Sequence, residues 1–134
     1  IDRIAGFMGG SLSGKRALVL GLGFRPEVKE HTCSSAFLIR DSLLAAGATC
    51  ELHDPLFSPS EISGLGFSVC KSVEEFDGGV VILNTAHKAY TQDGLPWEQW
   101  SGAGVKLFFD GRNALGEDFE APEEITILAV GKPR

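Results

Sequence analysis

The stretch Arg16-Ala17-Leu18-Val19-Leu20-Gly21-Leu22-Gly23-Phe24-Arg25-Pro26 decides the fold of this chain. Its apolar first half is typical of a strand buried on both faces, as in a parallel sheet. Gly21 and Gly23 then allow a sharp turn or the close approach of a ligand. Arg25 follows at the carboxyl end of the predicted strand, the edge at which open α/β sheets bind ligands. Because a guanidinium can bond two oxygens at once, this position suits a phosphate.

The remainder of the chain alternates between helical and strand patterns. We expect helices over about 35–46, 58–64, 72–76 and 96–100, and strands over about 16–22, 49–53, 67–70, 80–84, 105–109 and 125–130. Ser34 or Ser35 can cap the first helix, and Gly47 can end it. The alternation predicts an α/β three-layer sandwich with a Rossmann-like, mostly parallel sheet of five or six strands.

Length and composition narrow the class of protein. With 134 residues, 43% of them hydrophobic, the chain is expected to form one domain with a real core. Its formal charge of -6 argues against general affinity for nucleic acids, although it allows a local cationic pocket. No apolar run approaches the roughly 18 residues that span a membrane. Cys33, Cys50 and Cys70 are odd in number and lack C-x-x-C spacing, which predicts reduced cysteines in a cytoplasmic protein.

The first residues have a pattern of their own. Ile1, Ile4, Phe7 and Met8 have helical spacing before Gly9-Gly10, and the chain does not begin with Met. We therefore expect residues 1–14 to be the tail of an upstream helix with its linker, and residues 15–134 to form the domain. A mature N-terminus produced by processing remains the alternative.

Three predicted strand ends carry polar clusters: Phe24-Arg25, Thr85-Ala86-His87 and Asp110-Gly111-Arg112-Asn113. In a parallel sheet all three lie at one edge, so Arg25 and Arg112 could converge on one anion. Two arginines suit a diphosphate better than a single carboxylate. The alternative is structural: each arginine would cap a helix or pair with a nearby acid.

Other chemical signals are weaker. Gly21-Leu22-Gly23 begins a dinucleotide fingerprint, but Pro26 occupies the place of the third glycine. Cys33, near a predicted helix start and two residues from His31, has the minimal features of a nucleophile. A small residue packed at the helix start is the favoured interpretation. The histidines and cysteines have no metal-ligand spacing, and His87 is expected to be a hydrogen-bonded loop histidine rather than a ligand contact.

Several motifs, taken in order, resemble one family. They are Gly21-Leu22-Gly23-Phe24-Arg25-Pro26, Val28-Lys29-Glu30, Ser34, Ala36, Ala46-Gly47-Ala48, Asp54-Pro55 and Asp110-Gly111-Arg112-Asn113. Their order and intervals resemble the C-terminal, UDP-binding domain of the UDP-glucose/GDP-mannose dehydrogenases from about Lys15 to the end of the chain. These enzymes oxidise the C6 alcohol of a nucleotide sugar to a carboxylate with two NAD⁺.

The resemblance implies that three parts of a longer enzyme have separate functions. An N-terminal domain binds NAD, a long central helix forms a dimer, and the C-terminal domain binds the nucleotide sugar. It implies that Phe24, Arg25 and Arg112 contact the nucleotide sugar, with Lys29 included from the same loop. On this basis the chain alone is inert, and its partners are a UDP-sugar or another nucleotide sugar, its own NAD domain and a second copy of the protein.

The sequence also departs from the family pattern. Many members carry D-x-R-x-S after the first strand, but here Thr32 stands at the arginine position and only Ser34 agrees. The sugar and base are therefore left open. The family's catalytic cysteine motif does not occur, so none of the three cysteines is expected to be catalytic. The alternative function is a non-catalytic nucleotide-binding or dimerisation module of the same fold.

Overall fold

The computed structural model describes residues 11–23, 25–30, 35–112, 114–115 and 121–129, and the backbone of 132–133. The strands are β1 (Arg16–Leu20), β2 (Thr49–His53), β3 (Ser68–Val69), β4 (Val80–Leu83), β5 (Leu107–Asp110), β6 (Thr126–Ala129) and β7 (Lys132–Pro133). The helices are α2 (Ser35–Ala45), α3 (Pro59–Gly64), the 3₁₀ turn η1 (Val73–Glu75), α4 (Lys88–Thr91) and α5 (Trp97–Ala103). Among the described residues, no helix has the length and hydrophobicity needed to cross a bilayer.

These strands form one sheet in the order β3-β2-β1-β4-β5-β6-β7. All neighbours pair in parallel except β6 and β7, which are antiparallel. The predicted α/β sandwich with a mostly parallel sheet is therefore confirmed. The sequence did not predict the two-residue strand β7.

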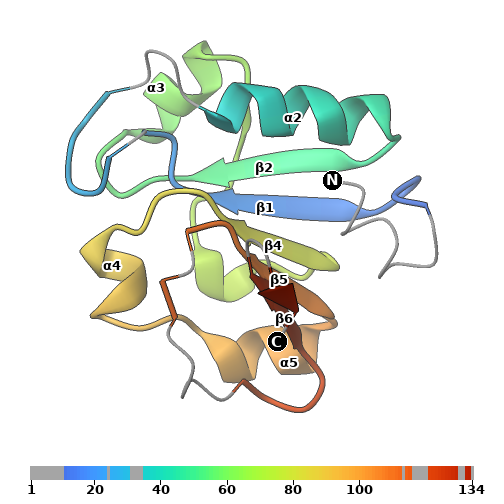
Figure 1. The fold of residues 1–134 in the computed structure, drawn as a ribbon. Helices are drawn as coiled ribbons and strands as arrows, with labels where there is room; N and C mark the ends of the chain where they lie inside the picture. Colours follow the sequence, from blue (N-terminus) through green and yellow to red (C-terminus); the bar gives the residue numbers. More distant parts are fainter. Residues whose placement is uncertain are drawn as a thin grey trace.

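The helices cover both faces of the sheet, with α2 and α3 on one side and α4 and α5 on the other (Figure 1). Successive residues of a strand face opposite layers. Val19 and Ile82 belong to the core under α2 and α3, whereas Leu20 and Leu83 belong to the core that contains Trp100 of α5. This arrangement buries both faces of β1 and β4 and explains their unbroken apolar runs.

Two helix ends follow the signals in the sequence. Gly47 has a φ of 86° directly after α2, which favours glycine. At the start of α3, Ser58 Oγ accepts the N–H of Glu61 while the Glu61 carboxylate accepts the N–H of Ser58, a reciprocal capping box. Pro59 occupies the first helical position, where its missing N–H costs no hydrogen bond.

The carboxyl ends of the strands create the edge from which the functional loops project. β1 and β2 point to the same end of the molecule, and the segment after β1 lies there together with α4 (Figure 1). Since β1, β2, β4 and β5 are parallel neighbours, residues far apart in sequence meet at this edge.

Candidate functional site

Arg112 is held at the carboxyl edge by a tight turn after β5. The buried carboxylate of Asp110 accepts backbone N–H groups from Arg112 at 3.2 Å, Ala114 at 3.0 Å and Leu115 at 2.9 Å. These bonds tie the backbone of Arg112, Ala114 and Leu115 to the end of the strand. The exposed Arg112 is thereby placed by the backbone of its own turn.

Two further contacts fix this turn against β4. A Cβ atom at Gly111 would lie 2.6 Å from the carbonyl oxygen of Leu83, so only glycine allows the close approach. Arg112 Nε donates a hydrogen bond to the carbonyl oxygen of Asn84, which follows β4. One side of the guanidinium is therefore anchored at the boundary between β4 and β5.

Arg25 and Lys29 lie in the loop after β1, and each is paired with a carboxylate. Arg25 makes a bidentate ion pair with Glu30, with N···O distances of 3.0 and 3.1 Å. That bond holds the pKa of Glu30 below its ordinary value. Lys29 Nζ lies 2.8 Å from a carboxylate oxygen of Glu61 and 5.4 Å from the ring centroid of Phe57. Arg25 thus makes the structural pair that the sequence left open as an alternative.

The sheet order determines how these cations relate to one another. β4 lies between β1 and β5, so the strand ends that carry Arg25 and Arg112 are roughly 10 Å apart at the usual strand spacing. Long side chains can meet one ligand across that span. The predicted contact Phe24 and the candidate nucleophile Cys33 lie outside the described residues.

Asn84 and Thr85 connect the two halves of this edge, a role that sequence reasoning missed. Asn84 Nδ2 donates to the carbonyl oxygen of Gly21 at 3.0 Å, and Thr85 Oγ1 donates to that of Gly23 at 2.5 Å. Both side chains are buried. Because the Asn84 carbonyl also accepts from Arg112, this residue joins the turn after β1 to the turn after β5. The available signal in the sequence was the position of these polar residues directly after a buried strand.

A buried pair, Asp54 and His87, lies beneath the loop after β1. His87 Nε2 is 3.1 Å from Asp54 Oδ2, and both side chains are fully buried. Asp54 also accepts N–H groups from Leu22 at 2.7 Å and Leu56 at 2.8 Å. His87 Nδ1 accepts the N–H of Glu27 at 2.9 Å. His87 is thus the hydrogen-bonded loop histidine that the sequence predicted.

The charge states of this pair follow from the same contacts. Burial alone would raise the pKa of Asp54, but hydrogen bonds from His87 and two backbone N–H groups keep that pKa below its ordinary value. Burial lowers the pKa of His87, but Asp54 and then Glu27 outweigh it and leave the pKa above its ordinary value. Asp54 is therefore an ionised acceptor at neutral pH.

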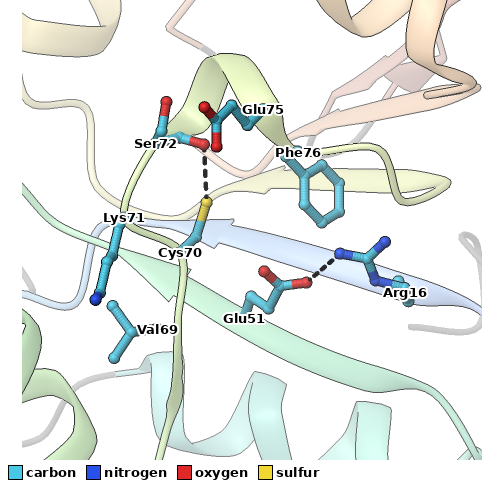
Figure 2. Close-up of a pocket in the computed structure, with 8 residues that line it drawn as sticks. All are labelled: Arg16, Glu51, Val69, Cys70, Lys71, Ser72, Glu75 and Phe76. Carbon is cyan, nitrogen blue, oxygen red and sulfur yellow. Dashed lines mark hydrogen bonds and ion pairs between the residues drawn. The ribbon is translucent and has the colours of Figure 1, made fainter.

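A separate pocket of about 290 Å³ lies beside β2, β3 and η1 (Figure 2). Arg16 in its wall is already paired with Glu51 at 2.8 Å and with Asp77. Burial raises the pKa of Cys70 in this wall to about 11, and that of Cys50 in β2 to about 12. Both thiols therefore stay protonated near neutral pH and are poor nucleophiles. Within the described residues, no three His, Cys, Asp or Glu side chains gather as a metal ion would require.

Solved structures similar to this chain share its fold over nearly its whole length. NDP-N-acetyl-D-galactosaminuronic acid dehydrogenase from Methanosarcina mazei Go1 is 21% identical with a TM-score of 0.77, over 98% of this chain and 27% of that one. UDP-D-ManNAc dehydrogenase from Pyrococcus horikoshii is 18% identical with a TM-score of 0.71, over 96% and 28%. A UDP-glucose dehydrogenase from Pyrobaculum islandicum is 25% identical with a TM-score of 0.64, over 84% and 25%. The chain thus spans about a quarter of the length of these proteins.

Sequence comparison identifies the family. No curated protein sequence matches the chain significantly. Residues 18–117 match the model of the UDP-glucose/GDP-mannose dehydrogenase family, UDP binding domain. The matched region includes the turn after β1, the Asp54–His87 pair, Asn84 and the Arg112 turn. Because the match covers most of the chain, this protein belongs to the UDP-glucose/GDP-mannose dehydrogenase family, of which it is the UDP-binding domain.

Proposed function

We propose that the carboxyl edge binds the diphosphate of a nucleotide sugar, as the substrate-binding domain of an NAD-dependent dehydrogenase that oxidises the C6 alcohol of a UDP-sugar to a UDP-uronic acid. One observation carries the proposal. Within the region matched by the UDP-binding family, the buried Asp110 and the close approach at Gly111 place Arg112 at an edge that also receives Arg25. The turns after β1 and β5 both lie at this edge and carry cations suited to phosphate oxygens.

The ion pairs of the loop are compatible with this role. Arg25 and Lys29 are both well exposed, and exposed ion pairs contribute little to stability. Exchanging Glu30 or Glu61 for a phosphate oxygen is therefore inexpensive. The diphosphate carries two negative charges, so two or three cations match it better than one. Phe24 precedes Arg25 and is included in the proposed site for a flat contact with the nucleotide sugar.

The described residues do not fit a dinucleotide. Gly21 is packed against Thr85, whose side chain occupies the space of a Cβ atom there. Pro26 replaces the third glycine, and the described residues 25–30 contain no helix that could start directly under a phosphate after the glycine turn. We therefore assign NAD to the N-terminal domain of a longer protein. The proposal includes a cytoplasmic location and assembly with a second copy.

Calorimetric titration of UDP-glucose into this chain tests the proposal. Arg112→Ala is expected to weaken binding about tenfold to a hundredfold, because a charge-assisted hydrogen bond contributes roughly 1.5–3 kcal/mol. Arg25→Ala is expected to weaken it less, since Arg25 is well exposed and already paired with Glu30. Lysine should restore binding better at position 25 than at position 112, where the guanidinium is anchored through Nε.

Lys106→Ala is the control, because Lys106 is an exposed cation that precedes β5 at the opposite edge. It should bind UDP-glucose like the wild type. If Arg112→Ala and Arg25→Ala also bind like the wild type, the arginines are structural and the site assignment is wrong. Binding by a protein whose gene encodes no upstream NAD domain would support the non-catalytic module instead.

A further inference from the structure

Glu27 has a backbone conformation that its own sequence does not favour. Its φ is 61°, in the left-handed region, and it is the one residue other than glycine with positive φ among those the structure describes. Such a conformation persists only where neighbouring contacts hold it. Here the N–H of Glu27 donates to His87 Nδ1 at 2.9 Å, and its Oε2 accepts the N–H of Lys88 at 2.9 Å. The segment after β4 therefore imposes this conformation on the loop.

We propose that His87 is a positioning residue for nucleotide-sugar binding: its neutral ring holds Glu27, and through it the loop that carries Arg25 and Lys29, and protonation of the ring releases that hold. This inference rests on the proposed function of the edge. It concerns a residue that is buried and does not itself touch the nucleotide.

The neutral ring has a defined tautomer. His87 Nε2 faces the ionised Asp54 at 3.1 Å, so the ring proton lies on Nε2. Nδ1 then presents a lone pair to the N–H of Glu27. Both side chains of the buried pair are inaccessible to solvent, so no bulk water replaces either bond. The N–H of Glu27 therefore depends on one acceptor atom, while Thr85 and Glu61 hold other points of the loop.

Protonation of Nδ1 changes this contact. Two N–H donors would then face each other, and the nearest acceptor for the new proton is Glu27 Oε2 at 3.3 Å. A carboxylate oxygen accepts more than one hydrogen bond, so Glu27 Oε2 can keep the N–H of Lys88 while it accepts this proton. Glu27 would thus exchange a backbone contact for a side-chain contact, and the loop must shift. The groups facing His87 are Asp54 and His53 from the end of β2, Glu27 from the loop and Tyr90 from α4.

Protonation of His87 stabilises the folded state, although it breaks the bond from the ring to the Glu27 N–H. The pKa of folded His87 lies above its ordinary value, because Asp54 and then Glu27 outweigh burial. Protonated His87 thus contributes stability that is fully present below the ordinary pKa of about 6.5 and is lost as pH rises through the folded value. Mild acid should therefore break the bond from the Glu27 N–H to Nδ1 without unfolding the domain, because the protonated ring keeps Asp54 and gains the Glu27 carboxylate.

Two substitutions separate the two ring nitrogens. The amide oxygen of Asn in His87→Asn is near the place of Nδ1 and can accept the Glu27 N–H, but this side chain is too short for Asp54. The amide nitrogen of Gln in His87→Gln is near the place of Nε2 and can donate to Asp54, but offers no acceptor at the Nδ1 position. We expect UDP-glucose binding to weaken about tenfold in His87→Gln and clearly less in His87→Asn.

His53→Asn is the matched control. His53 is a neighbouring histidine that bonds Tyr90 at 2.8 Å rather than the loop. Its replacement should leave UDP-glucose affinity and the Glu27 amide resonance in a ¹⁵N spectrum at wild-type values. In His87→Gln the Glu27 amide resonance should move even without ligand.

A pH series supplies the readout that a merely structural role would not affect. UDP-glucose is the probe, because its diphosphate has no terminal phosphate that titrates near pH 6. Wild-type affinity should fall as pH drops through the pKa of His87, and His87→Asn should abolish that dependence. Equal losses in His87→Gln and His87→Asn, or an unmoved Glu27 amide in His87→Gln, would overturn the inference. If the wild type does not bind UDP-glucose but the Glu27 amide moves as expected, the positioning role stands and the proposed function fails.

Discussion

In the loop after β1, carboxylates of the protein compete with the proposed ligand for the same cations. Glu30 holds Arg25 in a bidentate pair, and Glu61 holds Lys29. Each carboxylate occupies the donors that a phosphate would need. To bind at Arg25 and Lys29, a phosphate must therefore displace a carboxylate. Arg112 differs, because it is anchored to a backbone carbonyl.

Removing one competing charge should strengthen binding. We expect Glu30→Gln to raise UDP-glucose affinity by up to about fivefold, because an exposed ion pair is weak and its loss leaves Arg25 to the phosphate. Asp77→Asn is the control: it removes a carboxylate paired with Arg16, an arginine that begins β1 at the opposite edge. Calorimetric titration should show no gain for that control. Weaker binding in Glu30→Gln would mean that Glu30 orients Arg25 rather than competing for it.

The sequence could reveal residues whose role depends on neighbouring positions, but not residues whose role depends on a distant segment. Arg112 was identifiable because Asp110-Gly111-Arg112 follows an apolar run. Glu27 was not, because its conformation is set by His87, 60 residues further along the chain. Asn84 and Thr85 carried only a general signal, since their partners are backbone carbonyls in the turn after β1.

Among the elements, the turn after β1 controls the geometry of the edge. Gly21 has a φ of 98°, and a Cβ atom there would collide with the Thr85 side chain. Gly94 has a similar φ of 95° but nothing within 4 Å of that position. An alanine at either position would therefore have the same backbone strain, but only at position 21 would its Cβ atom collide with a neighbouring side chain.

This difference makes a matched pair of alanine variants informative. Gly94→Ala is expected to lower the free energy of unfolding by about 1 kcal/mol through strain alone. Gly21→Ala should lower it by roughly 1–3 kcal/mol more, because Thr85 must move. Urea unfolding followed by tryptophan fluorescence measures both. Equal losses would show that Thr85 yields without cost and that the β1–β4 contact is not rigid.

The element pattern also shows how far local sequence determines structure. The strand predicted over 49–53 and the capped helix from Ser58 appear as expected, because their signals are local. The sequence did not predict α4, a four-residue helix whose first N–H is held by Glu27. β5 begins later than the predicted residue 105, because the N–H of Val105 bonds Trp100 at the end of α5. These differences come from contacts between distant segments.

At the scale of the whole molecule, a rigid sandwich supports the edge that we propose to bind the nucleotide sugar. Two apolar layers fix the strands, and Arg25, Lys29 and Arg112 follow the carboxyl ends of β1 and β5 in a chain whose formal charge is -6. The opposite edge also has cations, including Lys15, Arg16 and Lys106, which line a separate open pocket. Overall charge therefore does not select the site; the turns that position the cations do.

Mapping UDP-glucose onto the chain by backbone amide chemical shifts tests this placement most directly. The shifts should saturate with ligand and gather after β1, β4 and β5, around Gly23, Asn84 and Gly111. Shifts gathered instead around Gly79 and Lys106 at the opposite edge, or around Cys70 in the separate pocket, would contradict the assignment, as would the absence of any saturable shift.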